Sequence, residues 1–442
     1  MNVISSAPPA YKRRIYWLLQ ALAHLLLPVV FFKLLLRSRK EPDHLKGFGE
    51  RLGFGAKADP NSIWFFAASV GEIRAASPLI KKFREAGQSV LLTYQSPAGK
   101  AEGKRLFADD PGVSHRFVAI DLFWAIRLFL RRQRPKLLIV LEIEIWPAML
   151  IESKRAGLPM IMANGNLLNK SIEKRGLLRS HLFALYRLFD SIYTRTDAYK
   201  QRYLSIGVEQ SRIHVVGDLR FDQQHNGEQI EVGNALRRKW TNISQVLLIA
   251  SSVEAEEPML VPLVRDLLTR FPTLGVIWAP RSPQRFDAVA SQCANFGFQI
   301  SRRSNLTNGT IEFDPNTRVV IADSIGEMDI WYHMSDLVFV GASLVAMGGH
   351  NIIEPLSHGK PVVMGPSIYG IEFAAREAER IGAFESLPNS DALGARLRSL
   401  FLTPEELDKM ASCAGSYTEN HMGAVSKTFA SVSELLEISC QQ

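Results

Sequence analysis

Residues 62–72 read SIWFFAASVGE, an apolar run that passes through a glycine into a glutamate. The run 62–67 has the length and composition of a buried strand. Gly71 indicates a turn, and Glu72 is an acid of the kind found in the first turn of a helix. A strand that leads directly into a helix predicts a βαβ unit, and therefore a parallel sheet.

The same alternation of strand and helix patterns continues along the chain and predicts an α/β protein with two Rossmann-like domains. A length of 442 residues independently favours two domains. The polar segment 222–233 has no strand pattern and is the predicted linker. Strands are expected at 62–67, 90–94, 116–120, 136–141, 160–164, 191–195 and 213–216 in the first domain, and at 246–251, 275–279, 319–323, 337–341 and 361–364 in the second.

Residues 15–32 form an apolar run about as long as a minimal membrane span, interrupted by Gln20, His24 and Pro28. We expect an uncleaved membrane-anchor helix that either crosses the bilayer or lies in its interface. A cleaved signal peptide and an amphipathic helix packed on the core are the alternatives. We expect removal of residues 1–40 to release a soluble catalytic body, whereas unfolding of the truncated protein would mean that the segment is core. Basic residues flank the run on both sides: Lys12, Arg13 and Arg14 before it, and Lys33, Arg37, Arg39 and Lys40 after it.

The predicted division is therefore 1–45 for the membrane anchor, 46–225 for the first α/β domain and 226–442 for the second. The helical tail 405–438 is expected to pack back on the first domain.

Composition limits the class of partner. The net charge of +8 favours an anionic partner, and basic residues gathered around an apolar run favour a membrane surface over a nucleic acid. Apolar residues make up 47% and charged residues 22%, which excludes a disordered chain. The three cysteines are too far apart for a zinc site or a disulfide framework, and a reducing compartment fits them. We find no Asp-x-Asp pair and no His or Cys cluster with ligand spacing, so no metal is predicted.

Candidate catalytic carboxylates follow two predicted strands. Ligands of α/β sheets bind beyond the carboxyl ends of the strands, so acids placed there are candidates. Glu72 is either a general base or a simple complement to the helix dipole. Glu142 and Glu144 end the apolar run 136–141. They point to opposite faces if the strand continues, and they could bind Mg²⁺ if they lie beyond it. They could also begin a helix, with Pro147 in its first position.

A glycine-rich segment near the C-terminus suits a phosphate. Gly348 and Gly349 let the backbone approach an anion, and the helix expected after them offers free N–H groups. Glu354, about one turn into that helix, is placed to bind ribose hydroxyls. An ordinary turn is the alternative. The chain has neither a Walker lysine motif nor a dinucleotide fingerprint.

With these residues in place, the chain resembles the 3-deoxy-D-manno-octulosonic acid (Kdo) transferases, glycosyltransferases that build the inner core of lipopolysaccharide. The resemblance runs in order over nearly the full length. It is carried by Gly49-Glu50-Arg51-Leu52-Gly53, Ser69-Val70-Gly71-Glu72, Glu142-Ile143-Glu144-Ile145-Trp146-Pro147, Gly217-Asp218-Leu219-Arg220-Phe221-Asp222, Ala279-Pro280-Arg281, Gly326-Glu327, and Gly349-His350-Asn351 with Glu354-Pro355.

The resemblance implies a GT-B fold, with two Rossmann-like domains facing a central cleft, and a membrane location on the cytoplasmic face of the inner membrane. It implies inverting, metal-independent transfer of Kdo from CMP-Kdo to a phosphorylated lipid A precursor, with no cofactor. Glu72 would deprotonate the acceptor, while Glu142 and Arg220 would assist the transition state. The residues implied to hold CMP are Pro280, Arg281, Ile325, Gly326, Glu327, Asn351, Ile352, Ile353 and Glu354.

Some positions differ from the family pattern. Val253 stands where the family has histidine, Asn166 where it has arginine, and Arg220 where it has lysine. A divergent paralogue acting on another acceptor, with Kdo or a related CMP-activated acid sugar, is therefore one alternative. A non-catalytic membrane-bound homologue is another, and the presence of Glu72 argues against it.

Overall fold

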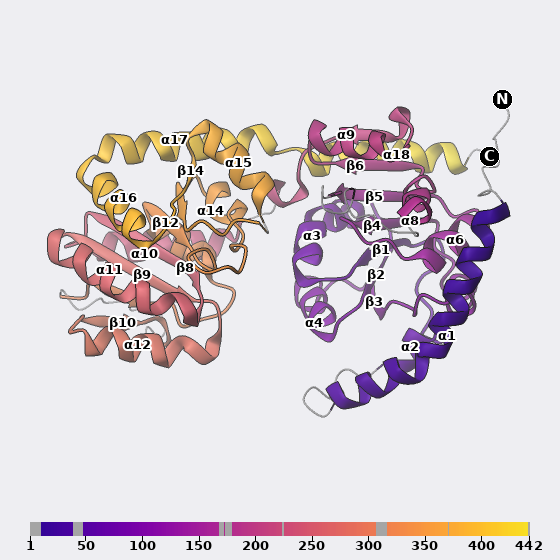
Figure 1. Ribbon diagram of the computed structural model, residues 1–442, viewed down its shortest axis with the longest axis horizontal. Coiled ribbons are helices and arrows are strands. Elements are labelled where there is room, and N and C mark those ends of the chain that lie inside the picture. Colours follow the sequence, from indigo (N-terminus) through magenta and orange to yellow (C-terminus); the bar gives the residue numbers. More distant parts are fainter. Residues whose placement is uncertain are drawn as a thin grey trace. The chain divides into compact units, whose positions relative to one another are not determined.

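The computed structural model describes residues 10–38, 47–167, 172, 179–222, 225–305, 316–369 and 371–440. The chain divides into two compact units, the first formed by residues 1–223 with 422–442 and the second by residues 224–421 (Figure 1). The last helix thus belongs to the first unit, whereas the part of the expected tail up to residue 421 belongs to the second.

The first unit is built on a seven-stranded sheet in the order β3-β2-β1-β4-β5-β6-β7, in which every paired neighbour is parallel. Parallel pairing places the carboxyl ends of all the strands at one edge. The strands are β1 (Ile63–Ala67), β2 (Val90–Tyr94), β3 (Val113–Phe117), β4 (Leu137–Leu141), β5 (Met160–Gly165), β6 (Ser191–Thr194) and β7 (Ile213–Val215).

Both faces of this sheet are covered, which explains why its central strands are apolar throughout. Trp64 and Phe66 of β1 join a core with α5, α6 and α8, while Phe65 and Ala67 join a core with α3 and α18 on the other face. The helices of the unit are α1 (Ala10–Ser38), α2 (Phe48–Arg51), α3 (Val70–Glu85), α4 (Pro97–Leu106), α5 (Phe123–Gln133), α6 (Pro147–Arg155), α8 (Arg179–Tyr186), α9 (Asp197–Ser205) and α18 (Ala424–Cys440), with a 3-10 turn η3 (Leu219–Asp222).

One strand of this sheet was placed wrongly by the sequence. β3 covers Val113–Phe117, whereas the pattern predicted 116–120. The strand lies at the sheet edge and carries His115 and Arg116, which are only partly buried, so its apolar signal is weak.

The second unit repeats the architecture with the order β10-β11-β9-β8-β12-β13-β14, again parallel throughout. Its strands are β8 (Gln245–Ser252), β9 (Leu274–Pro280), β10 (Ile300–Arg302), β11 (Val319–Ile321), β12 (Leu337–Val340), β13 (Val362–Met364) and β14 (Phe384–Ser386). Its α-helices are α10 (Gly227–Lys239), α11 (Glu257–Arg270), α12 (Phe286–Asn295), α13 (Met328–Met334), α14 (Ile353–Ser357), α15 (Glu372–Ile381), α16 (Ser390–Leu402) and α17 (Pro404–His421). A short 3-10 turn, η4 (Glu254–Glu256), precedes α11.

Two expectations for this unit were wrong. The short edge strands β10 and β14 were missed, because three residues with polar members give no periodic signal. The predicted linker 222–233 is helical from Gly227 onward, where the side chain of Asn226 accepts hydrogen bonds from the N–H groups of Glu228 and Gln229 and caps α10.

The expected C-terminal helical tail is two helices separated at Gly423. Gly423 has φ of 92°, a left-handed conformation that glycine adopts readily. The carboxylate of Asp222 accepts hydrogen bonds from the N–H groups of Gly423 and Val425, both at 2.6 Å, and so fixes the start of α18. Phe429 of α18 then packs against Phe83 of α3 with ring centroids 4.9 Å apart.

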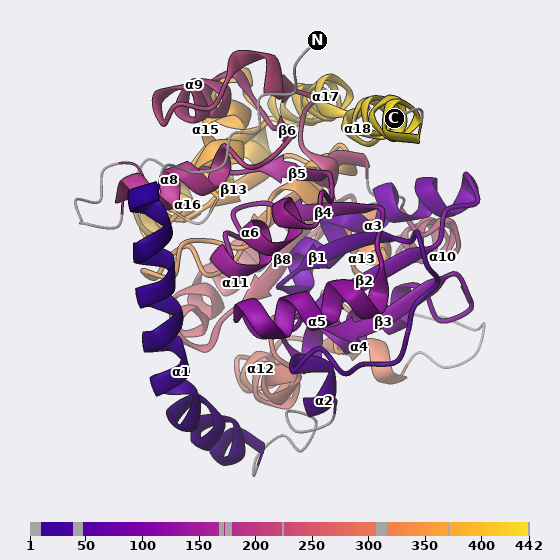
Figure 2. The same ribbon diagram turned by 90° about the vertical axis from the view of Figure 1, so that its right-hand side faces the viewer.

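Helix α1 lies against the first unit by one side only (Figure 2). The side chain of Gln20, buried on the inner side, donates to the Asp121 carbonyl at 3.0 Å and accepts from the Phe123 N–H at 2.9 Å. His24 accepts a hydrogen bond from the Trp124 indole at 3.1 Å. The polar residues that interrupt the apolar run are therefore the ones that dock α1 on the domain.

The opposite side of α1 is apolar and exposed; Leu25, for example, is 77% exposed. None of the helices in the described ranges combines the length and apolarity needed to cross a bilayer.

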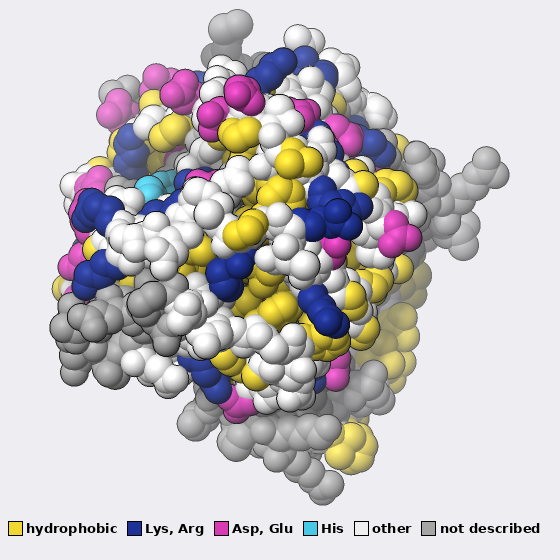
Figure 3. All heavy atoms as spheres, turned by 90° about the vertical axis from the view of Figure 1, so that its left-hand side faces the viewer, with side chains coloured by type: hydrophobic (Ala, Val, Ile, Leu, Met, Phe, Trp, Pro, Cys, Tyr) yellow, Lys and Arg dark blue, Asp and Glu magenta, His cyan; other side chains and the backbone are white. Residues whose placement is uncertain are grey.

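A face of the second unit is drawn in Figure 3. Lys and Arg side chains are interspersed there with Asp and Glu, and hydrophobic atoms emerge between them. Among the described residues that this view draws, the basic side chains do not form the continuous stripe typical of nucleic-acid binding.

Candidate functional site

The predicted catalytic residues of the first unit follow strands at the carboxyl edge of its sheet, with Glu72 in the first turn of α3, Glu142 just after β4 and Arg220 in η3. Glu72 follows β1, Glu142 follows β4 and Arg220 follows β7. β1 and β4 are hydrogen-bonded neighbours, so the segments that carry the two glutamates are adjacent. This is the edge at which parallel α/β sheets bind ligands.

Glu72 closes the N-terminus of α3. Ser69 is the N-cap and its hydroxyl oxygen accepts the Glu72 N–H at 3.2 Å, while the Glu72 carboxylate accepts the Ala68 N–H at 2.7 Å and the Ser69 hydroxyl at 3.0 Å. This exchange resembles a capping box and holds the side chain in one place. The capping role and a catalytic role are thus compatible, since the cap positions the carboxylate.

The carboxyl group of Glu72 is tuned to neutral pH. Burial raises its pKa to about 7; the Ala68 N–H opposes that rise, and the charges of Glu142 and Glu144 add to it. A carboxyl group that exchanges its proton near pH 7 is suited to general-base chemistry. The contribution of Glu142 and Glu144 also shows that both carboxylates lie close enough to Glu72 to act on it.

The structure decides between the alternatives for Glu142 and Glu144. β4 ends at Leu141, so both glutamates lie beyond the strand, and the opposite-face arrangement, which required the strand to continue, does not arise. Glu142 has φ of 57°, in the left-handed region that a residue with a Cβ seldom adopts. Glu144 accepts a hydrogen bond from the Trp146 indole at 2.8 Å. Pro147 begins α6 as predicted.

Arg195 joins Glu142 to a second buried acid. Its guanidinium donates to the Glu142 carboxylate at 2.6 Å, and its Nε lies 3.2 Å from the carboxylate of Asp218 without hydrogen-bond geometry. The side chain of Arg195 is only 4% exposed, and that of Asp218 has no exposed surface. A buried charge of this kind is stable only when it is paired.

Arg220 completes the network. Its Nε donates to Oδ1 of Asp218 at 3.0 Å and its Nη2 donates to Oδ2 at 2.6 Å, a bidentate pair. Burial raises the pKa of Asp218, but the guanidinium groups of Arg195 and Arg220 overcome that effect and hold it well below its usual range. Negative and positive charges therefore alternate along the row Glu142, Arg195, Asp218 and Arg220. Of the two arginines, Arg220 is the one that is partly exposed, with 22% of its side chain accessible.

The sequence did not predict the roles of Arg195 and Asn164, nor the pairing of Arg195 with Asp218. Asn164 has φ of 59°, donates to Glu142 at 3.4 Å and accepts from the Leu219 N–H at 3.2 Å. The available signal was position, since Asn164 and Arg195 end predicted strands of the same sheet. Their partners lie 22 and 53 residues from them along the chain, and only strand order reveals the pairing.

In the second unit, Arg281 and His350 form a corner whose charge is the Arg281 guanidinium. Arg281 follows β9, is exposed, and makes no ion pair among the described residues. Burial lowers the pKa of His350 and the Arg281 guanidinium lowers it further, so the two side chains are close. His350 Nε2 is buried without a hydrogen-bond partner. A free guanidinium beside an unsatisfied ring nitrogen suits an anionic ligand.

The segment after this corner begins the short helix α14. The Asn351 side chain accepts from the Ile353 N–H at 3.0 Å and donates to Glu354 at 3.2 Å, and Tyr332 donates to the other Glu354 oxygen at 3.4 Å. The side chains of Ile352 and Ile353 are buried. These two residues can therefore contact a ligand only through their backbone.

The remaining predicted donor residues differ in availability. Ile325 is 76% exposed, and the carbonyl of Gly326 accepts from the Gln229 side chain at 2.9 Å. Glu327 is held by a bidentate pair with Arg303 at 2.8 and 2.9 Å. Pro280 is a buried residue at the end of β9.

Comparison with known proteins identifies the family. A family model described as 3-deoxy-D-manno-octulosonic-acid transferase (kdotransferase) matches residues 46–223. The chain is 30% identical to the 3-deoxy-D-manno-octulosonic acid transferase of Haemophilus influenzae over 416 residues, which cover 93% of this chain and 96% of the relative. The chain belongs to the Kdo transferase family. The Kdo transferase of Bordetella pertussis is 31% identical, with 85% of this chain and 87% of the relative covered. These relatives are glycosyltransferases, so this Kdo transferase family member is an enzyme of that class, as the motifs predicted.

Solved structures confirm the predicted fold class of this Kdo transferase family member. A crystal structure of a UDP-N-acetylglucosamine 2-epimerase homologue from Listeria monocytogenes has a TM-score of 0.56 at 15% identity, covering 86% of this chain and 97% of that one. Anabaena Alr3699/HepE in complex with UDP also gives 0.56 at 15% identity, covering 85% and 99%. At this identity the likeness concerns the fold alone, which is the GT-B type with two Rossmann-like domains.

The described part of this Kdo transferase family member contains one group of His and Asp side chains placed for a metal, which the sequence did not predict. It consists of His225, Asp329 and His358, whose ligand atoms lie within 4.8 Å of one another. His358 Nε2 already pairs with Asp329 at 2.9 Å, and its Nδ1 is buried without a partner. A metal on Nε2 would force the proton onto Nδ1 and leave a buried N–H unpaired, whereas ligating histidines normally bond through that group. The group fits a His–Asp hydrogen bond between α13 and α14 better than a metal site.

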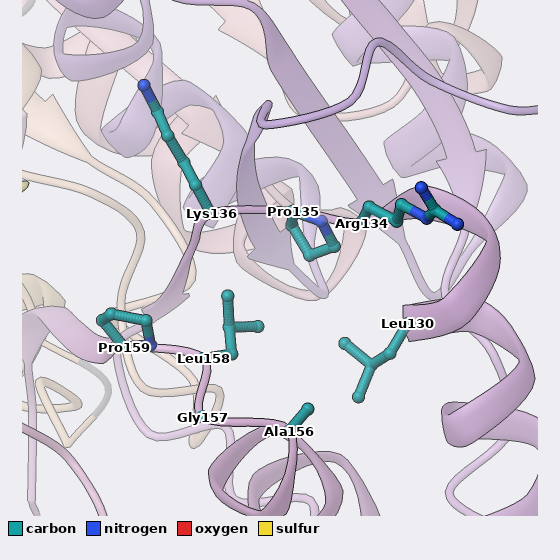
Figure 4. A pocket seen from close by; sticks show the side chains of 8 residues that line it. All are labelled: Leu130, Arg134, Pro135, Lys136, Ala156, Gly157, Leu158 and Pro159. Atoms are coloured by element: carbon teal, nitrogen blue, oxygen red, sulfur yellow. The ribbon is translucent and has the colours of Figure 1, made fainter. Parts of the chain in front are cut away.

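A pocket also opens at the opposite edge of the first sheet, near the amino ends of β4 and β5 (Figure 4). Leu130 and Leu158 point into it, while Lys136 extends away. It contains none of the predicted residues and lies at the edge where parallel sheets do not bind ligands. Its other lining residues are Arg134, Pro135, Ala156, Gly157 and Pro159.

We predict that Arg195→Met lowers the free energy of unfolding of this Kdo transferase family member by about 3 to 5 kcal/mol, because it leaves Asp218 and Glu142 without their buried cation. Urea denaturation followed by near-UV circular dichroism measures this. The control is Arg74→Met: Arg74 pairs with Glu102 at 2.6 Å but is 45% exposed, so its loss should cost about 1 kcal/mol or less. Equal effects of the two substitutions would contradict the assigned role of Arg195.

Proposed function

We propose that this enzyme transfers Kdo from CMP-Kdo to a phosphorylated lipid A precursor, as a step in lipopolysaccharide inner-core synthesis. The observation that carries the proposal is Glu72, a carboxylate with a pKa of about 7 fixed at the carboxyl edge of the first sheet, in a chain of the Kdo transferase family. The second candidate function is that of a paralogue that adds the sugar to another acceptor, such as an existing Kdo residue. It is favoured by Asn166, which stands where the family has arginine and whose side-chain oxygen is buried without a partner.

The proposed chemistry is one displacement with inversion. The acceptor hydroxyl loses its proton to Glu72 as its oxygen bonds to the anomeric carbon of Kdo. The bond from that carbon to the phosphate oxygen breaks, and CMP leaves with the electron pair. Positive charge on the sugar ring in the transition state is stabilised by the Glu142 carboxylate, and the partly exposed Arg220 guanidinium neutralises the Kdo carboxylate or the departing phosphate.

The donor residues we propose lie in the second unit. Arg281 and His350 offer cationic and N–H donors to the phosphate, and Glu354 offers a carboxylate to the ribose hydroxyls. The proposed site is completed by the backbone of five residues: Pro280, Ile325, Gly326, Ile352 and Ile353. Glu327 is paired with Arg303, so we assign it a structural role in this part of the site instead of a direct contact with the ligand.

We further propose that transfer needs neither metal nor cofactor. CMP leaves as a monophosphate, which carries less charge than a diphosphate and can be neutralised by fixed donors such as Arg281.

The test of this function is an assay with purified protein, CMP-Kdo and a lipid IVA type acceptor, with products counted by mass spectrometry. We expect one or more Kdo additions, and an unchanged initial rate after exhaustive EDTA treatment. Loss of activity on chelation that Mg²⁺ restores would overturn metal independence. A parallel reaction with a Kdo-bearing acceptor distinguishes the paralogue, which would act on that acceptor alone.

The pH dependence tests Glu72. Because the base must be ionised, we expect the rate to fall as pH drops through about 7, and Glu72→Gln to abolish transfer while CMP binding persists. Glu144→Gln removes a negative charge that raises the Glu72 pKa, so the fall should move to lower pH with little change in rate at pH 8.5.

The Glu144→Gln side chain can still accept the Trp146 hydrogen bond, so the fold is preserved. Glu85→Gln, an exposed residue at the end of the same helix α3, should leave the pH profile unchanged. A Glu144→Gln profile identical to that of the unaltered enzyme would exclude Glu72 as the titrating base.

We propose that α1 attaches the enzyme to the cytoplasmic face of the inner membrane by lying in the plane of the interface. Its inner side is engaged by the domain through Gln20 and His24, so the helix presents its outer apolar side to lipid. Basic residues at both ends of the segment suit anionic headgroups. Because the inner side of α1 is part of the core, removal of residues 1–40 should also destabilise the first unit.

Leu18, Leu22 and Leu25 share the outer side at helical spacing and are exposed. We predict that changing all three to Ser reduces sedimentation with phosphatidylethanolamine–phosphatidylglycerol vesicles at least about tenfold, since each loses the burial of a leucine side chain. Unfolding should be unaffected. Leu402→Ser, at an equally exposed leucine of the second unit, is the control. Unchanged vesicle binding of the triple variant would exclude α1 as the attachment.

A further inference from the structure

Glu256 is a carboxylate without exposed surface in the second unit, at the end of η4 and the start of α11. It accepts N–H groups from three successive residues of the loop after β12: Ala342 at 2.7 Å, Ser343 at 2.7 Å and Leu344 at 2.8 Å. The Val253 N–H adds a fourth bond at 3.3 Å. All four partners are donors, so the group binds as a carboxylate.

The three successive N–H groups form a concave anion-binding nest. Ala342 has φ of 59°, and a left-handed residue is what turns consecutive N–H groups toward one point. Such nests after strands of α/β sheets commonly hold phosphate. Here the Glu256 carboxylate of the protein itself occupies the nest. In the described part of the chain, no ion pair joins Glu256 to a Lys or Arg. The donors of this loop are therefore unavailable to a ligand.

The loop held by Glu256 supports the donor residues directly. The Ala342 carbonyl accepts the Gly349 N–H at 2.8 Å, and the Gly341 carbonyl accepts the His350 N–H at 3.1 Å. His350 is a member of the proposed donor site, and the next residue, Asn351, donates to Glu354 of that site. Two hydrogen-bonded steps thus connect the Glu256 carboxylate to the backbone of His350.

The backbone around this loop leaves little room for adjustment. A Cβ on Gly341 would lie 2.5 Å from the Ser251 carbonyl, and one on Gly365 would lie 2.4 Å from the Ser343 carbonyl. Ser343 also accepts the Gly365 N–H through its hydroxyl at 3.0 Å. The ends of β8, β12 and β13 are therefore packed around the segment that Glu256 binds.

We infer that Glu256 is a positioning residue for the donor site: an internal anion that occupies the nest at 342–344 and so sets the place of His350 and Asn351 against the nucleotide phosphate. The inference rests on the proposed assignment of the donor site. It also assigns the phosphate to Arg281 and the segment 348–354 rather than to the N–H groups that directly follow β12.

The test compares Glu256→Gln with Glu257→Gln in the full-length protein. A glutamine at 256 would place an NH2 group against N–H donors and lose the charge they stabilise. Glu257 is the matched control: it is equally buried and adjacent, but its carboxylate pairs with Arg285 at 2.5 Å and with Gln292 at 3.2 Å, and not with the loop.

CMP affinity is measured by calorimetry, and hydrogen–deuterium exchange is measured on peptides covering 341–352. We expect Glu256→Gln to raise the Kd for CMP at least about tenfold, the scale of a lost charged hydrogen bond, and to speed exchange in these peptides. Glu257→Gln should leave both within about twofold. If Glu256→Gln fails to fold, Glu256→Asp, which keeps the charge but shortens its reach, is judged by the same criteria.

Wild-type CMP affinity and exchange in the Glu256 variant would overturn the inference, and so would equal effects of the two substitutions. If the unaltered protein does not bind CMP, the proposed donor site falls. The exchange measurement then still decides whether Glu256 holds the loop.

Discussion

The ion pairs that Arg195 and Arg220 make with the fully buried Asp218 hold together the loops at the carboxyl edge of the first sheet. Asp218 cannot reach water, so its charge exists only because two guanidinium groups compensate for it. Arg195 also donates to the carboxylate of Glu142, a residue whose backbone lies in the left-handed region. The loops after β4, β6 and β7 thus take their positions from one carboxylate.

In the second unit, too, a buried carboxylate holds a loop at the carboxyl edge of the sheet, but its partners are different. The charge of Glu256 is compensated by backbone N–H groups instead of arginines. These N–H groups belong to the loop that Glu256 holds in place. In both units an acid with no exposed surface lies behind the residues proposed to contact the ligand. Parallel strands make this necessary, because they end together and leave several loops with unpaired backbone groups at one edge.

The sequence was a good guide where its signal is local. The apolar run before Glu72, the proline that begins α6 and the two parallel sheets all follow from short patterns of residue type. The polar edge strand β3 and the three-residue strands β10 and β14 carry too little periodicity to be placed. The partners of Glu142 were out of reach for another reason, since Asn164 and Arg195 are brought to it by strand order, which is settled by packing across the whole sheet. The tuning of Glu72 likewise depends on burial and on two other acids, neither of which its own motif describes.

The place of α18 has a consequence for synthesis. The chain completes the seven strands of the first unit before it enters the second, yet the helix that covers Phe83 and its neighbours on one face of that sheet is formed by residues that follow the whole second unit. While the ribosome makes the second unit, the part of this face that α18 will cover stays exposed. A nascent chain in this state is exposed to aggregation or to chaperone capture. Emergence of α18, rather than completion of the first sheet, is thus the event that closes the first unit.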